Sequence, residues 1–286
     1  MKAEGSLDLE FAIRLCSVSL CAMMRILFTL ILMLWSQAVV ACGRDSDCSV
    51  ADGTYRIALP DGPVKGTVWV LHGWQGTSAM ITGSDYLLKQ ANRRGLAVVA
   101  PHGLWRSWSF PGAPAKMRDD LAFLRMVKAD VVQRNGLDPD RMVLAGFSMG
   151  GSMVWNVACY QGSDFAGYVP LSGAYWDPVP ETCPSEIPLL FHVHGLKDDA
   201  VPFDGKVFGR GIAQSPVRAS FSQWFRQGAC GISDMRPVSD GKELRCDRRS
   251  CGGGVLELCV HDGGHRFRTD WIMRGWDKIA AIKGWH

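Results

Sequence analysis

A serine lies between two glycines in the pentapeptide Gly-Phe-Ser-Met-Gly at residues 146–150. The apolar segment 141–147 predicts a buried strand, and the segment 150–161 that follows predicts a helix. Glycines permit a sharp strand-to-helix turn that a Cβ would obstruct, and such a turn exposes the serine hydroxyl. The pattern therefore predicts Ser148 as a nucleophile. The alternative is a glycine-rich turn with a bystander serine.

A serine hydroxyl is a poor nucleophile until a base takes its proton, so the pattern requires a histidine. If the acid and then the histidine follow the nucleophile along the chain, three of the seven histidines qualify: His261, His265 and His286. His265 is the predicted base because it follows the strand-like segment 254–261 behind an Asp-Gly-Gly turn. His261 is assigned to the end of that strand, and His286 is the chain terminus.

The acid that orients the base is expected in the loop after the apolar strand 187–194. Asp198 is the preferred residue and Asp199 is the alternative, whereas Asp204 and Asp262 are more distant possibilities. A carboxylate in this loop would hold the histidine in one tautomer and stabilise the imidazolium that forms during attack. The other interpretation of the aspartate pair is a solvated loop.

Backbone donors for a developing oxyanion are expected where the strand 67–72 ends in a His-Gly pair. One donor would be the N–H of Trp74 in that loop, and the other the N–H of Met149, directly after the nucleophile. His72 itself is interpreted as a structural residue that holds the loop.

Aromatic residues gather on loops at the predicted carboxyl ends of strands, where ligands bind in α/β sheets. Trp105, Trp108 and Phe110 are therefore candidates, with Trp74, for stacking on an aromatic acyl group or a sugar face. Packing of loop onto loop is the alternative interpretation.

These motifs together resemble the polyhydroxybutyrate depolymerase / feruloyl esterase / acetylxylan esterase group of secreted α/β-hydrolases. The matching segments span roughly residues 50–270 and comprise Leu-His-Gly at 71–73, Pro-His-Gly-Leu at 101–104, Trp108, the aspartates at 119–120, residues 146–151, His-Gly at 194–195 with Asp198 and Val-Pro at 201–202, and Gly-Gly-His at 263–265. The resemblance implies a triad of Ser148, Asp198 and His265, with Trp74 and Met149 at the oxyanion hole.

Two positions near the site depart from the group's pattern. Members usually carry Asp where this chain has His102, and often Trp-Pro-Gly where this chain has Arg-Phe-Arg at 266–268. These departures concern the leaving-group and acyl pockets rather than the triad.

The implied fold is the α/β-hydrolase fold, with a mostly parallel sheet, helices on both faces and no large lid domain. Strands are predicted at 54–59, 67–72, 96–101, 141–147, 166–171, 187–194 and 254–261, and helices at 119–135, 150–161, 216–228 and 268–283. Only about a dozen residues separate the strand after the nucleophile helix from the acid strand. Residues 199–215 are long enough for a modest flap at most.

The implied activity is that of a secreted serine esterase. Its substrates would be aryl or feruloyl, acetyl, or short hydroxyalkanoate oligomer esters, cleaved through an acyl-enzyme without a cofactor or metal. The alternatives are an amidase or peptidase with the same triad, and a non-catalytic binding protein on a hydrolase scaffold. The net charge of +3 gives no support for nucleic-acid binding. The sequence makes no prediction of the oligomeric state.

The first 41 residues are predicted to be a signal peptide with cleavage after Ala41. Residues 1–23 contain Glu4, Asp8 and Glu10, which do not suit the amino end of a signal peptide, so a start of translation at Met23 or Met24 is the alternative. Residues 42–286 would then form a single catalytic domain, secreted or periplasmic and without a membrane span. A retained membrane anchor and a lipoprotein attached through Cys42 are the alternatives.

Eight of the ten cysteines remain after the leader, an even count that suggests up to four disulfides in an exported protein. Proximity in the sequence favours Cys42–Cys48 and Cys159–Cys183. The last four cysteines would pair among themselves, for example as Cys230–Cys246 and Cys251–Cys259, although sequence alone does not fix the connectivity.

Overall fold

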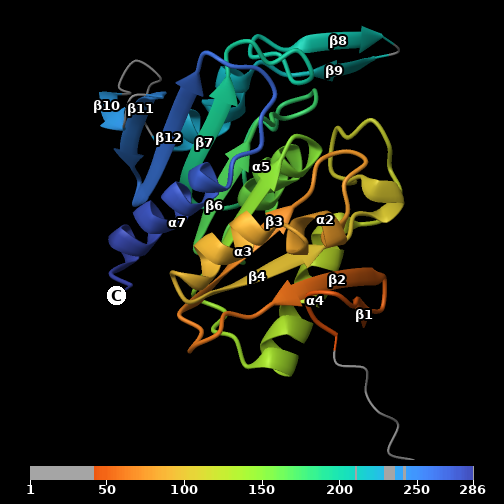
Figure 1. Cartoon of the computed structure of the whole chain (residues 1–286). Coiled ribbons are helices and arrows are strands. Elements are labelled where there is room, and N and C mark those ends of the chain that lie inside the picture. The colour runs from red at the N-terminus through yellow and green to blue at the C-terminus, as the bar shows by residue number, and fades with distance from the viewer. Residues whose placement is uncertain (1–41, 210, 229–235, 241–242, 286) are drawn as a thin grey trace, which may run out of the picture. The chain divides into compact units, whose positions relative to one another are not determined.

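A ten-stranded sheet lies at the centre of the computed structural model, which describes residues 42–209, 211–228, 236–240 and 243–285 (Figure 1). The strands of this sheet lie side by side in the order β1-β2-β4-β3-β5-β6-β7-β12-β11-β10. Their bounds are β1 (Cys48–Val50), β2 (Gly53–Ala58), β3 (Gly66–Leu71), β4 (Leu96–Pro101), β5 (Met142–Phe147), β6 (Gly167–Leu171), β7 (Leu189–Gly195), β10 (Arg236–Asp240), β11 (Leu244–Cys251) and β12 (Gly254–His261). A separate hairpin consists of β8 (Lys206–Gly209) and β9 (Ile212–Gln214).

Helical segments connect the strands. They are α2 (Ser78–Thr82), α3 (Asp85–Asn92), the 3₁₀ turn η1 (Leu104–Arg106), α4 (Asp120–Asn135), α5 (Met149–Tyr160), the 3₁₀ turn η2 (Val217–Phe221), α6 (Ser222–Gln227) and α7 (Thr269–Lys283). The Asp119 side chain caps α4 by accepting a hydrogen bond from Ala122 N at 3.0 Å, and Gly136 ends it in the left-handed conformation. Every predicted strand and helix is present, with the predicted helix 216–228 divided into η2 and α6.

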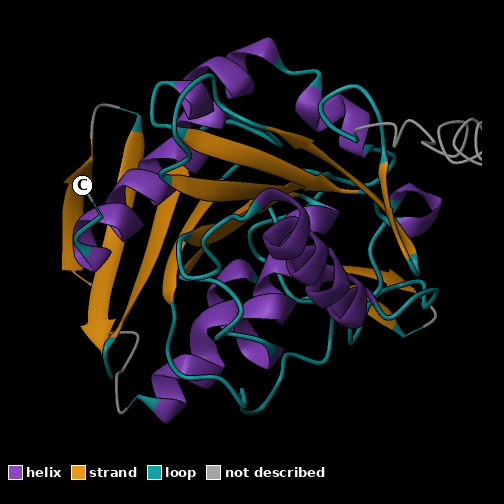
Figure 2. Cartoon of the chain, turned by 90° about the horizontal axis from the view of Figure 1, so that it is seen from below, coloured by secondary structure: helices purple, strands orange, loops and turns teal. Residues whose placement is uncertain are grey.

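The six central strands, β4, β3, β5, β6, β7 and β12, pair in parallel, and antiparallel strands extend the sheet at both edges. Alternate residues of a strand face opposite sides of the sheet. In β3, Trp69 and Leu71 pack in the hydrophobic cluster that contains residues of α4 and α5, whereas Val68 and Val70 pack in the cluster that contains residues of α3 and α7. Figure 2 shows helices on both sides of the sheet. The predicted α/β-hydrolase architecture is therefore confirmed.

Three disulfides connect described residues: Cys42–Cys48, Cys159–Cys183 and Cys246–Cys259. The first two were expected from sequence proximity. The third corrects the suggested pairs Cys230–Cys246 and Cys251–Cys259, because the antiparallel register of β11 and β12 places Cys246 directly opposite Cys259. Cys230 lies outside the described residues.

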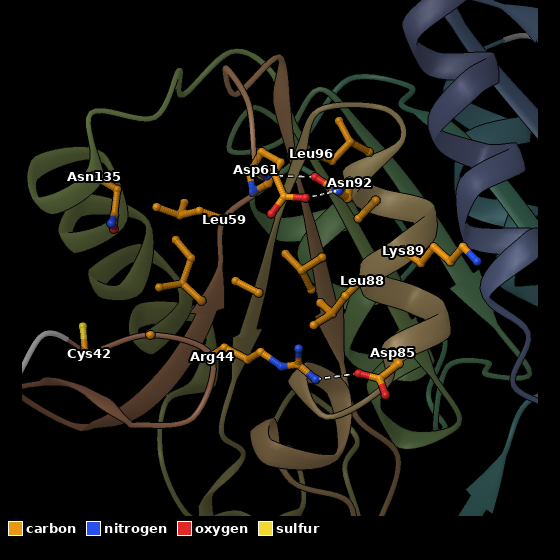
Figure 3. A pocket seen from close by; sticks show the side chains of 16 residues that line it. Cys42, Arg44, Leu59, Asp61, Asp85, Leu88, Lys89, Asn92, Leu96 and Asn135 are labelled. Atoms are coloured by element: carbon orange, nitrogen blue, oxygen red, sulfur yellow. Dashed lines mark hydrogen bonds and ion pairs between the residues drawn. The ribbon is translucent and has the colours of Figure 1, made fainter.

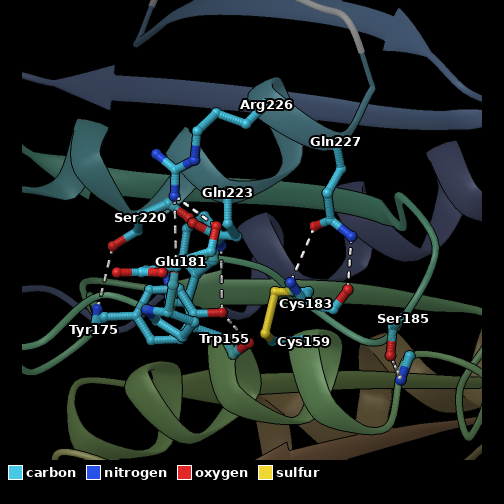
Figure 4. The surroundings of a disulfide bond; sticks show 12 residues. Trp155, Cys159, Tyr175, Glu181, Cys183, Ser185, Ser220, Gln223, Arg226 and Gln227 are labelled. Atoms are coloured by element: carbon cyan, nitrogen blue, oxygen red, sulfur yellow. Dashed lines mark hydrogen bonds between the residues drawn. A yellow bond between two sulfur atoms is a disulfide. The ribbon is translucent and has the colours of Figure 1, made fainter.

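The disulfide Cys159–Cys183 joins the end of α5 to the segment between β6 and β7 (Figure 4). The side chain of Gln227, in α6, holds the same segment twice: its Oε1 accepts from Cys183 N at 3.1 Å, and its Nε2 donates to Cys183 O at 2.6 Å. The helix that follows Ser148 is therefore anchored at its far end by a covalent bond.

No large lid covers the sheet among the described residues. The segment expected to form a modest flap contains the β8–β9 hairpin, whose Val207 is exposed and whose Phe208 ring stacks on Trp176 with centroids 5.3 Å apart. The antiparallel strands β10 and β11 were not predicted. None of the described helices has the length and apolar character needed to span a membrane. The predicted signal peptide, residues 1–41, lies outside the described residues.

Candidate active site

Ser148 lies on the sharp turn between β5 and α5, as the sequence predicts. Its backbone has φ 57° and ψ −121°, a conformation that costs a non-glycine residue energy and that the surrounding structure must impose. A Cβ on Gly146 would lie 2.4 Å from the carbonyl oxygen of Gly150, and one on Gly150 would lie 2.3 Å from that of Leu71. The two glycines thus permit the close turn that carries Ser148.

Asp198 and His265 meet at the ends of two neighbouring parallel strands. β7 and β12 end in register, with His261 opposite Gly195, so the loops that follow them lie together. His265 Nδ1 is 2.7 Å from Asp198 Oδ2. The other carboxylate oxygen, Oδ1, accepts hydrogen bonds from Ala200 N at 3.1 Å and Val201 N at 2.8 Å. The aspartate can only accept, so His265 donates from Nδ1, and Nε2 of the neutral ring is left as an acceptor.

The Asp198 side chain is fully buried, whereas the His265 side chain keeps 19% of its surface exposed. Burial alone would raise the pKa of the Asp198 carboxyl. The hydrogen bonds from His265 and from the Val201 amide outweigh burial and hold that pKa below its ordinary value. Asp198 is therefore ionised at neutral pH and faces the imidazole.

The alternatives raised from the sequence are less suitable. Asp199 and Asp204 are exposed, and Asp262 pairs with Arg245 at 2.8 Å on the surface. His261 is buried, and its Nδ1 accepts a hydrogen bond from Gly263 N at 3.0 Å. His286 lies outside the described residues.

The segments that carry Ser148 and His265 are in contact. The ring centroid of Phe147, the residue before the serine, lies 4.5 Å from that of His265, and the Phe267 ring packs edge-on against Phe147 with centroids 5.8 Å apart. The contact of Phe147 with His265 was not predicted from the sequence. Phe147 is the variable second residue of the Gly-x-Ser-x-Gly motif, and this position next to the nucleophile could have indicated that it lies near the base. The structure brings all three residues of the predicted triad to one end of the sheet.

The loop after β3 runs beside the serine. A Cβ on Gly73 would lie 3.2 Å from Ser148 Cβ, so the backbone that leads into Trp74 passes close to the nucleophile. Met149 is the first residue of α5, and N–H groups in the first turn of a helix have no acceptor within the helix. Both predicted oxyanion donors are thus near Ser148, one in the adjoining loop and one in the next peptide unit.

His72 ties two loops of the site together. Its Nε2 accepts a hydrogen bond from Gly103 N at 3.0 Å, so its proton is on Nδ1, which donates to Gly73 O at 2.8 Å. Burial lowers the pKa of His72 to about 4, which keeps the ring neutral at pH 7. His72 therefore has the structural role expected for it, and the departure at His102 lies in the same loop pair, where His102 Nδ1 accepts from Ser78 N at 3.3 Å.

The aromatic residues predicted to bind substrate divide into two groups. Trp74 and Trp105 are exposed, with 68% and 77% of their surface accessible. Trp108 and Phe110 are buried, and Trp108 Nε1 donates to His72 O at 2.7 Å. Trp108 and Phe110 keep only 1% and 4% of their surface accessible, which favours the alternative interpretation, packing of loop onto loop.

The exposed tryptophans lie on two loops that are joined by backbone hydrogen bonding. Gln75 N donates to Arg106 O at 2.8 Å, and the Arg106 guanidinium donates to Gln75 O. Gln75, Trp105 and Arg106 all have positive φ, although none of them is a glycine. These hydrogen bonds hold together the two loops that carry the exposed tryptophans.

Two hollows among the described residues lie elsewhere. One, of about 620 Å³, has Leu88 and Leu96 in its lining, and the ion pair Arg44–Asp85 at 2.6 Å crosses its rim (Figure 3). The other, of about 730 Å³, is lined by residues near the amino ends of β6 and β7. Neither contains a residue of the predicted triad, so neither is the candidate active site.

One group of described residues has the proximity needed to hold a metal ion. Ligand atoms of Cys246, Glu257 and Cys259 lie within 4.8 Å of one another. The two cysteines are joined in a disulfide, and Glu257 pairs with Arg248 and Arg274, so these atoms already have partners.

Comparisons with known proteins relate this chain to ester hydrolases. Residues 120–213 match the family model described as Phospholipase/Carboxylesterase. The chain is 27% identical over 253 residues to the putative esterase NocK of Nocardia uniformis, and the aligned region covers 80% of this chain and 73% of that protein. It is 28% identical over 169 residues to a probable feruloyl esterase C of Aspergillus clavatus, and here the aligned region covers 58% of this chain and 55% of that protein.

Among solved structures, the acetyl xylan esterase from Aspergillus awamori has the same fold, with a TM-score of 0.58 and 13% identity over 79% of this chain and 94% of that one. The predicted resemblance to esterases with the α/β-hydrolase fold, feruloyl esterases among them, is confirmed by these relatives. So is the enzyme class, a carboxylic-ester hydrolase with the α/β-hydrolase fold.

Proposed function

We propose that the protein is a serine esterase in which Ser148 is the nucleophile, His265 the base and Asp198 the acid that orients the base. The observation that carries this proposal is the 2.7 Å contact between His265 Nδ1 and Asp198 Oδ2, at the same end of the sheet as the serine held at positive φ. An elbow serine, a buried carboxylate and an imidazole, in this order along the chain, are the components of acyl transfer.

The first half-reaction forms an acyl-enzyme. Ser148 Oγ attacks the ester carbonyl carbon while His265 Nε2 takes the hydroxyl proton, and Asp198 stabilises the resulting imidazolium. The N–H groups of Trp74 and Met149 donate to the oxyanion, and loss of one such donor costs about 3–4 kcal/mol of transition-state stabilisation. His265 then gives the proton to the leaving alcohol oxygen as the C–O bond breaks.

The second half-reaction releases the acid. A water molecule gives its proton to His265 Nε2 and attacks the acyl carbon, and the same donors hold the second oxyanion. His265 returns the proton to Ser148 Oγ as the acyl-enzyme bond breaks. The cycle consumes one water and needs no redox partner.

The substrates we propose are aryl or feruloyl, acetyl, or short hydroxyalkanoate oligomer esters. Two features support this range: the absence of a large lid among the described residues, and the exposed tryptophans Trp74 and Trp105 beside the oxyanion loop. The names of the relatives, feruloyl esterase and acetyl xylan esterase, agree with it. Flat indole rings suit an aromatic acyl group or a sugar face.

We further propose that residues 1–41 are a signal peptide and that residues 42–286 act as one secreted or periplasmic catalytic domain. The three disulfides support export, because disulfides persist in oxidising compartments. Expression with the native leader, followed by N-terminal sequencing of exported protein, tests the cleavage site after Ala41.

The activity is tested with the chain from Cys42 onward, folded under oxidising conditions. Initial rates are measured on p-nitrophenyl acetate and butyrate, methyl ferulate, acetylated xylan and 3-hydroxybutyrate oligomers. Ser148→Ala is the blank, and Ser163→Ala, which changes an exposed serine at the opposite end of the sheet, is the matched control. We expect Ser148 to be required and Ser163 to be dispensable. Hydrolysis of an anilide without hydrolysis of the matching ester would identify an amidase instead.

A further inference from the structure

Two buried histidines lie on β7 directly behind the Asp198 loop, and the proposed chemistry uses neither of them. His192 and His194 are both fully buried. His194 Nε2 is 2.8 Å from the carbonyl oxygen of Val201, and His194 Nδ1 is 3.0 Å from His192 Nε2. The side chains thus form a hydrogen-bonded chain that ends at the loop carrying the acid.

The tautomers of His194 and His192 follow from the acceptor at the end of this hydrogen-bonded pair. A carbonyl oxygen can only accept, so His194 carries its proton on Nε2 and must accept on Nδ1. His192 therefore donates from its Nε2. Burial lowers the pKa of His194 to about 4 and the pKa of His192 well below its ordinary value, so both rings are neutral at pH 7. The 3.6 Å separation between His194 Nε2 and Asp198 Oδ2 is accordingly a contact with a neutral ring and not an ion pair.

Val201 links the two halves of this arrangement. Its carbonyl oxygen receives the His194 hydrogen bond, and its amide donates to Asp198 Oδ1 at 2.8 Å. The other carboxylate oxygen meets His265 at 2.7 Å. A shift of Val201 would therefore rotate or displace the carboxylate that orients the base. Misplacing a catalytic group by about 1 Å can cost on the order of 10²-fold in rate.

We propose that His194 is a positioning residue that fixes Val201, and through it the carboxylate of Asp198, while His192 holds the His194 ring by donating to its Nδ1. This inference rests on the proposed esterase function, because it gives the pair a purpose only if Asp198 orients His265. His194 touches no reacting atom: it acts through the loop and through its 3.6 Å contact with Asp198 Oδ2.

The test compares two substitutions at one position with a control elsewhere. His194→Gln keeps a side-chain N–H able to reach Val201 O, whereas His194→Leu removes it. Tyr168→Phe removes another buried hydrogen bond to a backbone carbonyl, from Tyr168 Oη to Gln161 O at 3.2 Å, at the opposite end of the sheet. All variants are made in the chain from Cys42 onward and are compared by thermal unfolding.

We expect His194→Leu to lower kcat by about 10–100-fold with little change in KM, because ground-state binding does not involve Asp198. His194→Gln should restore kcat to within a few-fold of wild type. Tyr168→Phe should lower the melting temperature and leave kcat unchanged. The ¹H resonance of the His265 Nδ1 proton, shifted downfield by Asp198, should be lost in His194→Leu and kept in the other two.

A wild-type kcat in folded His194→Leu would overturn the proposal, and so would an equal loss of kcat in His194→Gln with the downfield resonance intact. If His194→Leu does not fold, His194→Asn replaces it, since its shorter side chain does not reach Val201 O, and the same results are expected. Turnover that persists in Ser148→Ala would instead refute the esterase mechanism. The resonance, which does not depend on turnover, would still report on His194.

Discussion

Asp198→Asn is expected to disable the base His265 by moving its ring proton from Nδ1 to Nε2, without disturbing the fold. In the wild type Oδ1 of Asp198 accepts from Ala200 N and Val201 N, at 3.1 and 2.8 Å, and Oδ2 accepts from His265. An asparagine must keep its amide oxygen at the Oδ1 position, because an NH₂ group there would face two backbone donors. Its NH₂ group is then forced toward His265.

An NH₂ group at the Oδ2 position donates to His265 Nδ1, so the imidazole proton moves to Nε2. With a proton on Nε2 the ring cannot accept the Ser148 hydroxyl proton. A triad with this change loses about 10⁴-fold in kcat, which corresponds to about 5 kcal/mol at about 1.4 kcal/mol for each factor of ten. KM should change little, because the acid does not touch the substrate.

The assay is steady-state hydrolysis of p-nitrophenyl acetate at pH 7 by the wild type and by Asp198→Asn. Asp199→Asn is the matched control, since Asp199 is the exposed neighbour in the same loop. We expect wild-type rates from the control. If Asp198→Asn kept kcat within ten-fold of wild type while Asp199→Asn lost activity, the assignment of the acid would be wrong.

Three further predictions follow from other parts of the molecule. Trp105 is exposed, so Trp105→Ala should change the free energy of unfolding by less than about 0.5 kcal/mol. The substitution should raise KM for methyl ferulate more than KM for p-nitrophenyl acetate, and equal changes in the two KM values would exclude stacking of Trp105 on the aryl group. Replacing both Cys159 and Cys183 by Ser opens a loop with a sequence separation of 24 residues and should lower the free energy of unfolding by about 3 kcal/mol in denaturant titrations; an unchanged value would show that the bridge does not constrain the unfolded chain. His72 and His194 have pKa values lowered to about 4, so below about pH 6.5 the unfolded chain binds protons that the native protein excludes. The urea midpoint of unfolding should therefore fall as the pH drops from about 6.5 to about 4. A midpoint that rose over this range would contradict the buried, neutral state of both rings.

The sequence could predict the elements that carry a strong local signal. The central strands are buried on both faces and read as continuous apolar segments, as in 67–72, so their positions were recognisable. The turn at Ser148 was equally recognisable, because Gly146 and Gly150 fill positions where a Cβ would collide with backbone. Chain order alone then limited the base and the acid to a few candidates.

Other features depend on contacts between distant segments. The strand β8, Lys206–Gly209, is exposed along its length and has no apolar alternation to reveal it. The pairing of Cys246 with Cys259 is set by the register of β11 on β12, which residue spacing does not encode. Trp108 is a loop residue that packs in the hydrophobic core and donates to His72 O, and its contrast with exposed Trp105 could not be predicted from two tryptophans three positions apart.

The covalent step through Ser148 is tested most directly by trapping it. Wild type, Ser148→Ala and Asp198→Asn are incubated with a fluorophosphonate probe, and the adduct is located by intact mass and peptide mapping. Reaction through the triad predicts one adduct, on Ser148, formed rapidly by the wild type, slowly by Asp198→Asn and not at all by Ser148→Ala. An adduct on another residue, or no adduct on folded wild-type protein that still hydrolyses esters, would contradict the mechanism.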